Sequence, residues 1–275
     1  MNFASIPQVL LGLSSVLLSS FLFGGNAAWA DVSISPMVFE TEAKRGQTQG
    51  TVTIYNADPK AFRARVYTAP FTYERELGFQ ALSSSQNDLA PYLQFSPREL
   101  QVNGSGKRNI RFIVRFPPSL PDGEYRTMVF TENLQTATVT QNDTKNNVVF
   151  NTTIVPRIGV AVYVRKGNVS PSLSAVSARL SPKAKKIQLL VSNKGKASAI
   201  VAGNWTLKKA GQVIQKGTTS DTTIIAEGDR YISVNSTTPN QPALKPGDYE
   251  LSGDFGWGEN KKNRFPFKVT LTVPK

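Results

Sequence analysis

The sequence predicts an all-β protein made of two immunoglobulin-like β-sandwich domains. Most segments after residue 30 alternate apolar and polar residues with a period of two, as GTVTIYN, RNIRFIVRF and FKVTLTV do, which is the pattern of half-buried strands. Turn residues interrupt these segments about every 8–12 residues, as in β-sandwiches, and the 275 residues include 17 prolines and 20 glycines to form the turns. Finally, the two halves of the chain repeat short phrases, which predicts two related domains.

Two repeated phrases carry this prediction of a duplication. Residues 121–126 read PDGEYR and residues 245–250 read KPGDYE. In each phrase a turn, a glycine and an acidic residue precede a tyrosine and a strand, which resembles a tyrosine corner, where the tyrosine hydroxyl bonds back to upstream backbone. The strand endings TIYNADPK and LLVSNKGK also match, because each closes on an asparagine, Asn56 or Asn193, before a basic turn.

The N-terminal thirty residues have the features of a secretory signal peptide. They contain no charged side chain, and an apolar stretch over residues 9–24 precedes an Ala-Trp-Ala phrase that ends at Ala30, as at a cleavage site. We expect cleavage after Ala30, the alternative being an uncleaved membrane anchor. No later segment is long and apolar enough to cross a bilayer, so we expect no membrane insertion after cleavage. The predicted organisation is a signal peptide (1–30), a first domain (31–166) and a second domain (167–275).

The chain contains no cysteine and no histidine. Their absence removes the Ser-His-Asp triad, the Cys-His dyad, thiol redox chemistry and nearly all zinc and copper sites. No pair of carboxylates stands in a context that marks it as a catalytic acid and base. We therefore expect neither an enzyme nor a cofactor-binding protein, and no metal site.

The protein is strongly basic, with a net charge of +13. Residues 167–275 hold 16 basic and 7 acidic residues, so the second domain alone carries +9. These basic residues are scattered singly or in pairs, whereas a nucleic-acid-binding stripe would cluster them and interleave aromatic residues. We expect no nucleic-acid partner. The charge indicates either a solvated basic surface or attraction to an acidic partner or an anionic envelope surface.

One predicted strand is unusually long. Residues 146–167 read NNVVFNTTIVPRIGVAVYVRKG, and the apolar-rich run within them extends from Val148 to Arg165, although an average strand has roughly five or six residues. Pro156 interrupts it, and because proline has no N–H it requires an edge strand or a bulge. We expect the second half, IGVAVYV, to pair within the first domain. The first half is either a frayed hairpin strand or a segment offered to a partner.

Several phrases, in their order along the chain, resemble those of the PapD-like periplasmic chaperones of pilus assembly. They are SISPMVFETEAKRG, LQFSPREL with the strands that follow it, Tyr163-Val164-Arg165, and Gly253-Asp254-Phe255-Gly256. The resemblance is closer over residues 31–166 than over 167–275. It implies two domains in an L or boomerang arrangement, a periplasmic location, and a non-enzymatic chaperone. The implied partners are a pilus subunit or another incomplete immunoglobulin-like subunit, and an outer-membrane usher.

The resemblance also implies how a partner binds. In that family the chaperone lends its last first-domain strand to a subunit that lacks one strand, which is donor-strand complementation. The residues implied for this role share one face by their period of two: Val148, Phe150, Thr152 and Ile154. The family further joins its two domains through an internal salt bridge, which implies a triad of Glu124, Arg165 and Asp254 here. The alternative is that these are three unrelated surface charges.

The sequence departs from the family at its carboxylate clamp. Family members hold the subunit's terminal carboxylate with an Arg of the first strand and a Lys of the last strand. Those positions are Pro36 and Ala161 here. Arg157 shares the strand face of Ala161 and is the substitute we consider, although it lies roughly 13 Å away along a strand. Lys44 and Arg45 are further candidates.

A second function remains open at this point. A structural or adhesive envelope protein could use its basic second domain to bind an anionic polymer or another protein. Salt should abolish such charge-driven binding, whereas donor-strand binding should survive moderate salt.

Overall fold

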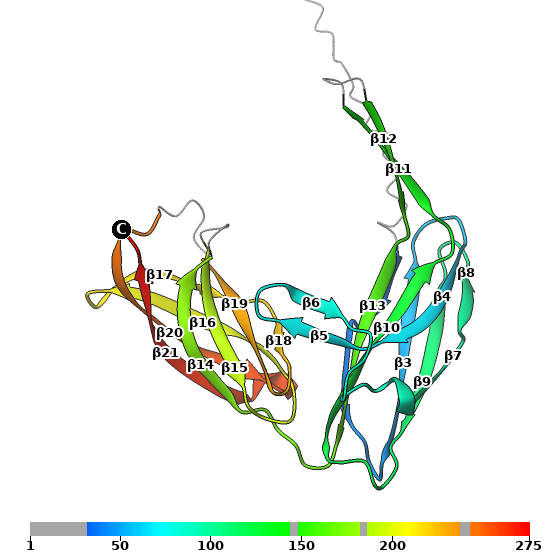
Figure 1. Ribbon diagram of the computed structural model, residues 1–275, viewed down its shortest axis with the longest axis horizontal. Coiled ribbons are helices and arrows are strands. Elements are labelled where there is room, and N and C mark those ends of the chain that lie inside the picture. The colour runs from blue at the N-terminus through cyan, green and yellow to red at the C-terminus, as the bar shows by residue number, and fades with distance from the viewer. Residues whose placement is uncertain (1–31, 144–147, 182–185, 237–242) are drawn as a thin grey trace, which may run out of the picture.

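The computed structural model describes residues 32–143, 148–181, 186–236 and 243–275. The predicted signal peptide lies outside them. The described chain is almost entirely β-strand and forms two sandwiches that meet at an angle, in an L-shaped arrangement (Figure 1). The predicted all-β class with two immunoglobulin-like domains is therefore confirmed. In the described residues, no helix has the length and apolar character needed to span a membrane.

The first domain consists of two antiparallel-rich sheets that face each other. One has the order β1 (Val32–Ser35), β3 (Gln47–Asn56), β9 (Lys107–Arg115) and β7 (Leu93–Ser96). The other has the order β2 (Val38–Glu42), β13 (Arg157–Lys166), β10 (Gly123–Asn133), β4 (Phe62–Ala69) and β8 (Glu99–Val102). A cis peptide bond precedes Pro36, between β1 and β2. The N-terminal segment thus leaves one sheet and joins the other.

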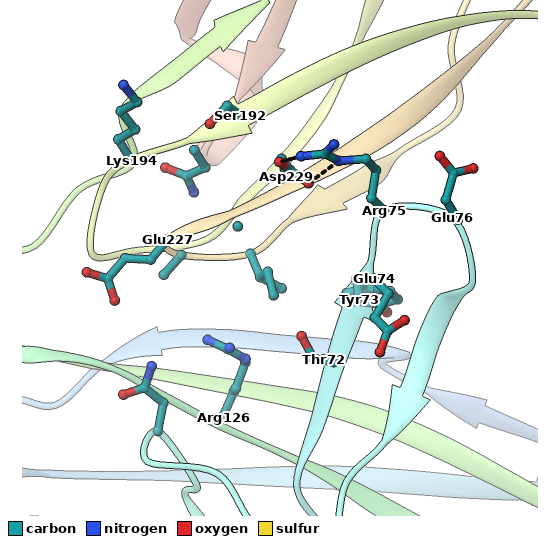
Figure 2. Close-up of a pocket in the computed structure, with 15 residues that line it drawn as sticks. Thr72, Tyr73, Glu74, Arg75, Glu76, Arg126, Ser192, Lys194, Glu227 and Asp229 are labelled. Carbon is teal, nitrogen blue, oxygen red and sulfur yellow. Dashed lines mark hydrogen bonds and ion pairs between the residues drawn. The ribbon is translucent and has the colours of Figure 1, made fainter. Parts of the chain in front are cut away.

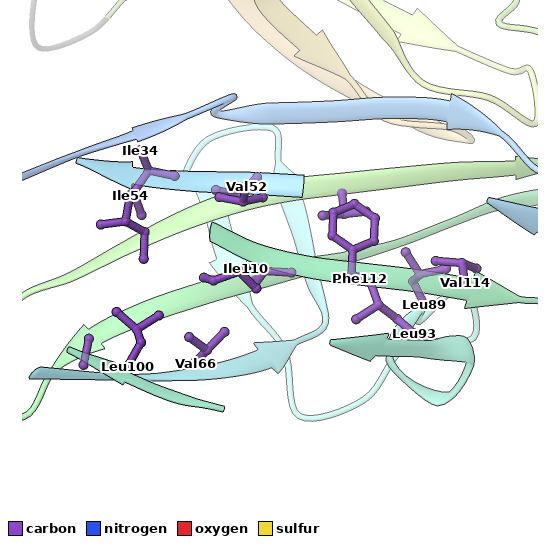
Figure 3. Close-up of a cluster of buried hydrophobic side chains, with 14 of the residues drawn as sticks. Ile34, Val52, Ile54, Val66, Leu89, Leu93, Leu100, Ile110, Phe112 and Val114 are labelled. Carbon is purple, nitrogen blue, oxygen red and sulfur yellow. The ribbon is translucent and has the colours of Figure 1, made fainter. Parts of the chain in front are cut away.

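Alternate side chains from both sheets fill the core of this domain. Figure 3 shows Ile110, Phe112 and Val114 of β9 on the same side of their strand, among Val52 and Ile54 of β3. Burying an aliphatic or aromatic side chain of this size is worth about 1.5–3 kcal/mol. Because side chains alternate along a strand, the intervening residues of β9 face outward.

The second domain contains β14 (Leu173–Leu180), β15 (Ile187–Asn193), β16 (Ala199–Lys209), β17 (Gln212–Thr218), β18 (Thr222–Ile224), β19 (Gly228–Ser236), β20 (Gly247–Trp257) and β21 (Asn263–Val273). Their order is β14-β15-β19-β17-β16-β20-β21, and β18 pairs with β16. The two ends of this order, β14 and β21, also lie in contact, so the sheet folds back on itself around its core. Trp205 and Phe255 are fully buried there.

The predicted repeats occupy matching places in the two domains. Tyr125 donates its hydroxyl hydrogen bond to the Pro121 carbonyl over 3.0 Å, and Tyr249 donates to the Lys245 carbonyl over 2.8 Å, so both tyrosine corners are confirmed. Asn56 and Asn193 are both buried, and each donates from its amide to the carbonyl four residues on. Each also accepts from the backbone N–H two residues on. The duplication is therefore present in the hydrogen bonds of both domains.

Two hairpins extend from the first domain. The first consists of β5 (Phe71–Glu74) and β6 (Gly78–Ala81), and the second of β11 (Ala137–Asp143) and β12 (Val148–Ile154). Figure 1 shows β5–β6 reaching across to the second domain and β11–β12 projecting away from both sandwiches. Two short 3₁₀ turns, η1 (Ala90–Tyr92) and η2 (Glu259–Lys261), complete the described elements.

Candidate partner-binding site

The long apolar run forms two strands that Pro156 separates. β12 ends at Ile154 and β13 begins at Arg157. The carbonyl of Pro156 accepts from the Asn133 N–H over 3.1 Å, which ties this junction to the end of β10. The predicted division of the run at Pro156 is confirmed.

Both faces of β13 are buried. Val160, Val162 and Val164 lie in the core between the two sheets of the first domain. On the opposite face, Ala161 and Tyr163 lie in a smaller core beneath the β5–β6 hairpin. The expectation that IGVAVYV belongs to the first domain is therefore confirmed, and a partner could reach this strand only along its edge.

A strand edge without a neighbour extends from β12 into β13. β2 pairs in parallel with β13 from Val38 opposite Ala161 to Glu42 opposite Arg165. Within the described residues, 157–160 therefore pair only with β10, and β12 pairs only with β11. We name residues 148–160 the free edge.

The free edge includes the four residues implied for strand donation. Their backbone positions are defined by pairing with β11, which places Thr152 opposite Val139 and Ile154 opposite Ala137. Thr152 is exposed, and Ile154 is 42% exposed. The side chains of Val148 and Phe150 lie outside the described part of the structure. The exposed apolar residue Val155 continues the edge toward Pro156.

The two clamp positions hold no basic residue; Pro36 is exposed, whereas Ala161 is buried and leaves little room for one. Pro36 stands between β1 and β2. Ala161 is 4% exposed and packs with Phe71, Met128 and Tyr163, so a longer side chain there would displace that core. Neither position therefore supplies the cation that a carboxylate clamp of the family's kind requires.

Arg157, the substitute, is already engaged at the edge of the same face. Its Nη1 donates to the Tyr67 hydroxyl over 3.1 Å, and its guanidinium lies 4.6 Å from the ring centre of Phe130. It remains an exposed cation beside the free edge, since Arg157 opens β13.

A buried polar cluster joins the two domains at the other end of β13. Glu124 on β10 has no exposed side-chain surface, and its carboxylate accepts hydrogen bonds from the Ser198 N–H, over 2.8 Å, and from the Ser198 hydroxyl. Arg165, opposite Glu124 in the register, donates to the Ser198 carbonyl over 3.1 Å. Its Nε lies 3.6 Å from Glu124. A carboxylate buried in this way requires such partners.

Asp254 is not part of this cluster. It pairs with Arg264 on the adjacent strand β21, with Nη2 to Oδ2 at 2.6 Å. Instead, Glu40 of β2 contacts the Arg165 guanidinium. The implied triad is therefore corrected to Glu40, Glu124 and Arg165. Asp254 and Arg264 are diagonal neighbours across β20 and β21, a spacing at which side chains of opposite charge meet.

Glu40 titrates differently from an exposed glutamate. Burial raises its pKa, and this outweighs the attraction of Arg165, which lowers it; the nearby Glu124 raises it further. The cluster thus holds two carboxylates around Arg165.

A second group of contacts joins the domains through the β5–β6 hairpin. Arg75 donates from Nε to Asp229 of β19 over 2.9 Å, and Arg179 of β14 donates to Glu76 over 2.7 Å. The Arg230 guanidinium lies 4.2 Å from the ring centre of Tyr73. We call these contacts the clasp. No sequence pattern predicted them, although FTYERELGF, with two alternating aromatic residues on β5 and one on β6, was the signal for a covered hairpin.

A cavity of about 960 Å³ lies between the two domains, and residues of the clasp form part of its wall. Figure 2 shows Arg126 pointing into it from β10, with Lys194 and Glu227 of the second domain across the space. Arg126 is 7% exposed, and its Nε and Nη1 have no hydrogen-bond partner among the described residues. Its nearest carboxylate oxygen is Glu124 Oε1, 3.9 Å from Nη1.

Neither a protein-family model nor a curated protein matches the sequence. Among solved structures the chain is similar to the YadV chaperone, with 12% identity over 88% of this chain and 100% of that chain, and a TM-score of 0.47. It is also similar to a chain of the CsuC–CsuE chaperone–tip adhesion subunit complex of Acinetobacter baumannii, with 14% identity, 89% and 100% coverage, and a TM-score of 0.48.

A third similar structure is that of the Salmonella enterica SafA pilin with the SafB chaperone, with 12% identity, 88% and 96% coverage, and a TM-score of 0.45. Each of the three is described as a chaperone or as a complex that contains one, the class that the sequence resembles. Since one fold serves many functions, these similarities do not by themselves assign a function.

Proposed function

We propose that the protein is a periplasmic chaperone that binds pilus or fimbrial-type subunits by donor-strand complementation. The observation that carries the proposal is the free edge. β12 offers one complete row of backbone donors and acceptors, since within the described residues it pairs only with β11. An extended edge of this kind is a template for an added strand.

In this proposal the two halves of the long run have different roles. Val148, Phe150, Thr152 and Ile154 enter the groove of an immunoglobulin-like subunit that lacks a strand, and main-chain hydrogen bonds along β12 provide affinity. β13 holds the donor in place because its Val160, Val162 and Val164 are buried in the first domain. Arg157 lies where these halves meet, and it is the residue we expect to bind an acidic group of the client.

The remaining parts of the proposal concern location and domain geometry. The chain is exported, cleaved after Ala30, and active in the periplasm with an outer-membrane usher as a second partner. The domains span 31–166 and 167–275, and Glu40, Glu124 and Arg165 hold the angle between them. The activity is binding, without catalysis or a cofactor.

The proposal is tested by placing charge on the donor face. The double variant F150D/I154D should lose at least tenfold in recovery of its clients, since each client groove would have to bury two carboxylates. Tagged protein is captured from periplasm at moderate salt, and bound proteins are identified by mass spectrometry. The expected clients are exported proteins with an immunoglobulin-like domain that lacks a strand.

A matched control changes two exposed apolar residues of another strand. Val213 and Ile214 lie on β17 of the second domain and are both exposed, so V213D/I214D makes the same chemical change away from the free edge. Clients should be retained by this variant. Equal recovery by wild type and F150D/I154D would refute donor-strand binding.

A further inference from the structure

The outer face of the sheet β1-β3-β9-β7 is basic and carries no acid. The sequences of these four strands, VSIS, QTQGTVTIYN, KRNIRFIVR and LQFS, contain no Asp or Glu. Figure 3 shows Ile110, Phe112 and Val114 pointing into the core. Lys107, Arg111 and Arg115 alternate with them and are exposed, so they face solvent. We call this surface the β9 face.

The cations of the β9 face differ from those of the opposite sheet. On β4, Arg63 pairs with Glu99 and Arg65 with Glu132. On β9, neither Lys107 nor Arg111 has a carboxylate partner in the described parts of the chain.

Arg115 has only a neutral partner there, since its Nη1 donates to the Gln94 amide over 3.3 Å. Cations without carboxylate partners, on four strands that contain no Asp or Glu, indicate a surface that attracts an anion.

The spacing of these cations suits a linear partner. Lys107, Arg111 and Arg115 follow one another at intervals of four residues on a single strand, or about 13 Å each along its axis. Amides and hydroxyls of the neighbouring strands flank this row. Arg111 lines a shallow hollow of about 300 Å³, together with Gln49, Gln94 and Ser96 and with the apolar residues Phe95, Phe112 and Ile113.

The composition of the β9 face favours a polysaccharide over a protein or a nucleic acid. A stable protein interface needs aromatic or apolar anchors that a partner can bury, whereas Tyr55 is the exposed large hydrophobic residue among the described residues of these four strands. Single-stranded nucleic acid needs successive aromatic residues for base stacking. Among the described outward residues of these strands, Tyr55 is the exposed aromatic side chain. By contrast, the side-chain amides and hydroxyls of this face can form hydrogen bonds with the hydroxyl groups of a sugar.

We propose that the β9 face binds an acidic polysaccharide, with Arg111 and Arg115 pairing with its carboxylates and Gln49 and Gln94 bonding its hydroxyl groups. This moves the expected anionic-polymer site from the second domain to the first. It is independent of strand donation, because the free edge belongs to β12 and β13, neither of which is in the sheet that contains β9.

The experiment measures binding of the full mature chain to polygalacturonate, with dextran as the uncharged control. Wild type should bind polygalacturonate but not dextran, and its affinity should fall as salt is raised. R111Q/R115Q should bind at least tenfold more weakly, with an unchanged melting temperature. R111E alone should also weaken binding and gives a second measurement if the double variant is unstable.

The matched control is K208Q/K209Q, which removes two charges from the second domain. It should bind polygalacturonate as wild type does. Loss of binding in K208Q/K209Q with retention in R111Q/R115Q and R111E would place the site in the second domain and overturn the proposal. Absence of polygalacturonate binding, or tighter binding to a single-stranded oligonucleotide, would also overturn it. None of these results depends on whether clients bind the free edge.

Discussion

The two hairpins of the first domain share a simple architecture but have opposite surroundings. β5–β6 reaches the second domain, whereas β11–β12 points away from it (Figure 1). Phe71 at the base of β5–β6 is 1% exposed, and the tip of that hairpin makes two ion pairs with the second domain. On β12, Thr152 and Ile154 are exposed, and the strand pairs only with β11 in the described chain.

This difference assigns each hairpin a role. A hairpin alone is marginally stable in water, so β5–β6 gains its order from the core beneath it and from the clasp. β11–β12 has no comparable cover among the described residues. One hairpin thus joins the two domains, while the other leaves one edge of β12 without a neighbouring strand in the described residues.

The largest effect is expected at the base of β5–β6. Phe71 packs against Tyr163, with ring centres 5.8 Å apart, and against Tyr73 and Phe79. Phe71→Ala should lower the free energy of unfolding by about 3–5 kcal/mol, because it leaves a cavity in a buried cluster. Denaturant unfolding followed by tyrosine or tryptophan fluorescence measures this change.

Ile154→Ala is the matched substitution on the other hairpin. Since Ile154 is exposed, its truncation should change the free energy of unfolding by less than about 0.5 kcal/mol while still weakening client binding. Similar losses of stability in both variants would remove the distinction between the two hairpins.

The second prediction concerns the clasp. R75A/E76A removes both ion pairs at the hairpin tip but leaves Phe71 in place. Exposed pairs contribute little to stability, so the melting temperature should change only slightly. The distribution of interdomain angles should broaden, because the hairpin would no longer hold the second domain. Small-angle scattering measures this broadening.

Two further variants separate the clasp from other ion pairs. Arg264→Ala breaks the pair with Asp254 inside the second domain and should leave the scattering unchanged. Arg165→Ala removes the cation beside the buried Glu124 and should both destabilise the protein and change the interdomain angle. If R75A/E76A scatters as wild type does, the buried cluster alone holds the angle.

Local sequence patterns predicted those features that depend on neighbours along the chain. Alternation predicted the strands, Pro156 predicted the end of β12, and the repeated phrases predicted the corners of Tyr125 and Tyr249. β13 was also predicted to remain in the first domain, because it follows Pro156 and precedes the domain boundary expected after residue 166.

The clasp was not predictable in this way. Arg75 and Asp229 are 154 residues apart in the sequence, and they meet only because the two domains adopt one particular angle. The same limit explains Glu40, which reaches Arg165 because β2 runs parallel beside β13. No local period encodes either contact. The resemblance pointed to Asp254 instead, but cross-strand geometry pairs that residue with Arg264.

The smallest expected effect is the response of the clasp to pH. The hydrogen bond from Arg75 lowers the pKa of Asp229, and the hydrogen bond from Arg179 lowers that of Glu76. A carboxyl with a lowered pKa in the folded state binds fewer protons there than in the unfolded state. Each carboxyl therefore stabilises the clasp fully at pH values above its ordinary pKa, which is 3.8 for Asp229 and 4.5 for Glu76. This contribution is lost as the pH falls through the lowered pKa of the folded state.

The buried cluster should respond in the opposite sense. Because burial raises the pKa of Glu40, the stability that this carboxyl contributes is present below its ordinary pKa and declines as pH rises through the raised value. Acidification from pH 7 to 3 should therefore loosen β5–β6, while at Glu40 it relieves the cost of burying a charged carboxylate. Amide exchange of β5 and β19 should increase at low pH in wild type but change less in R75A/E76A. Glu40→Gln should leave the increase in amide exchange at low pH intact, because Glu40 belongs to the buried cluster and not to the clasp.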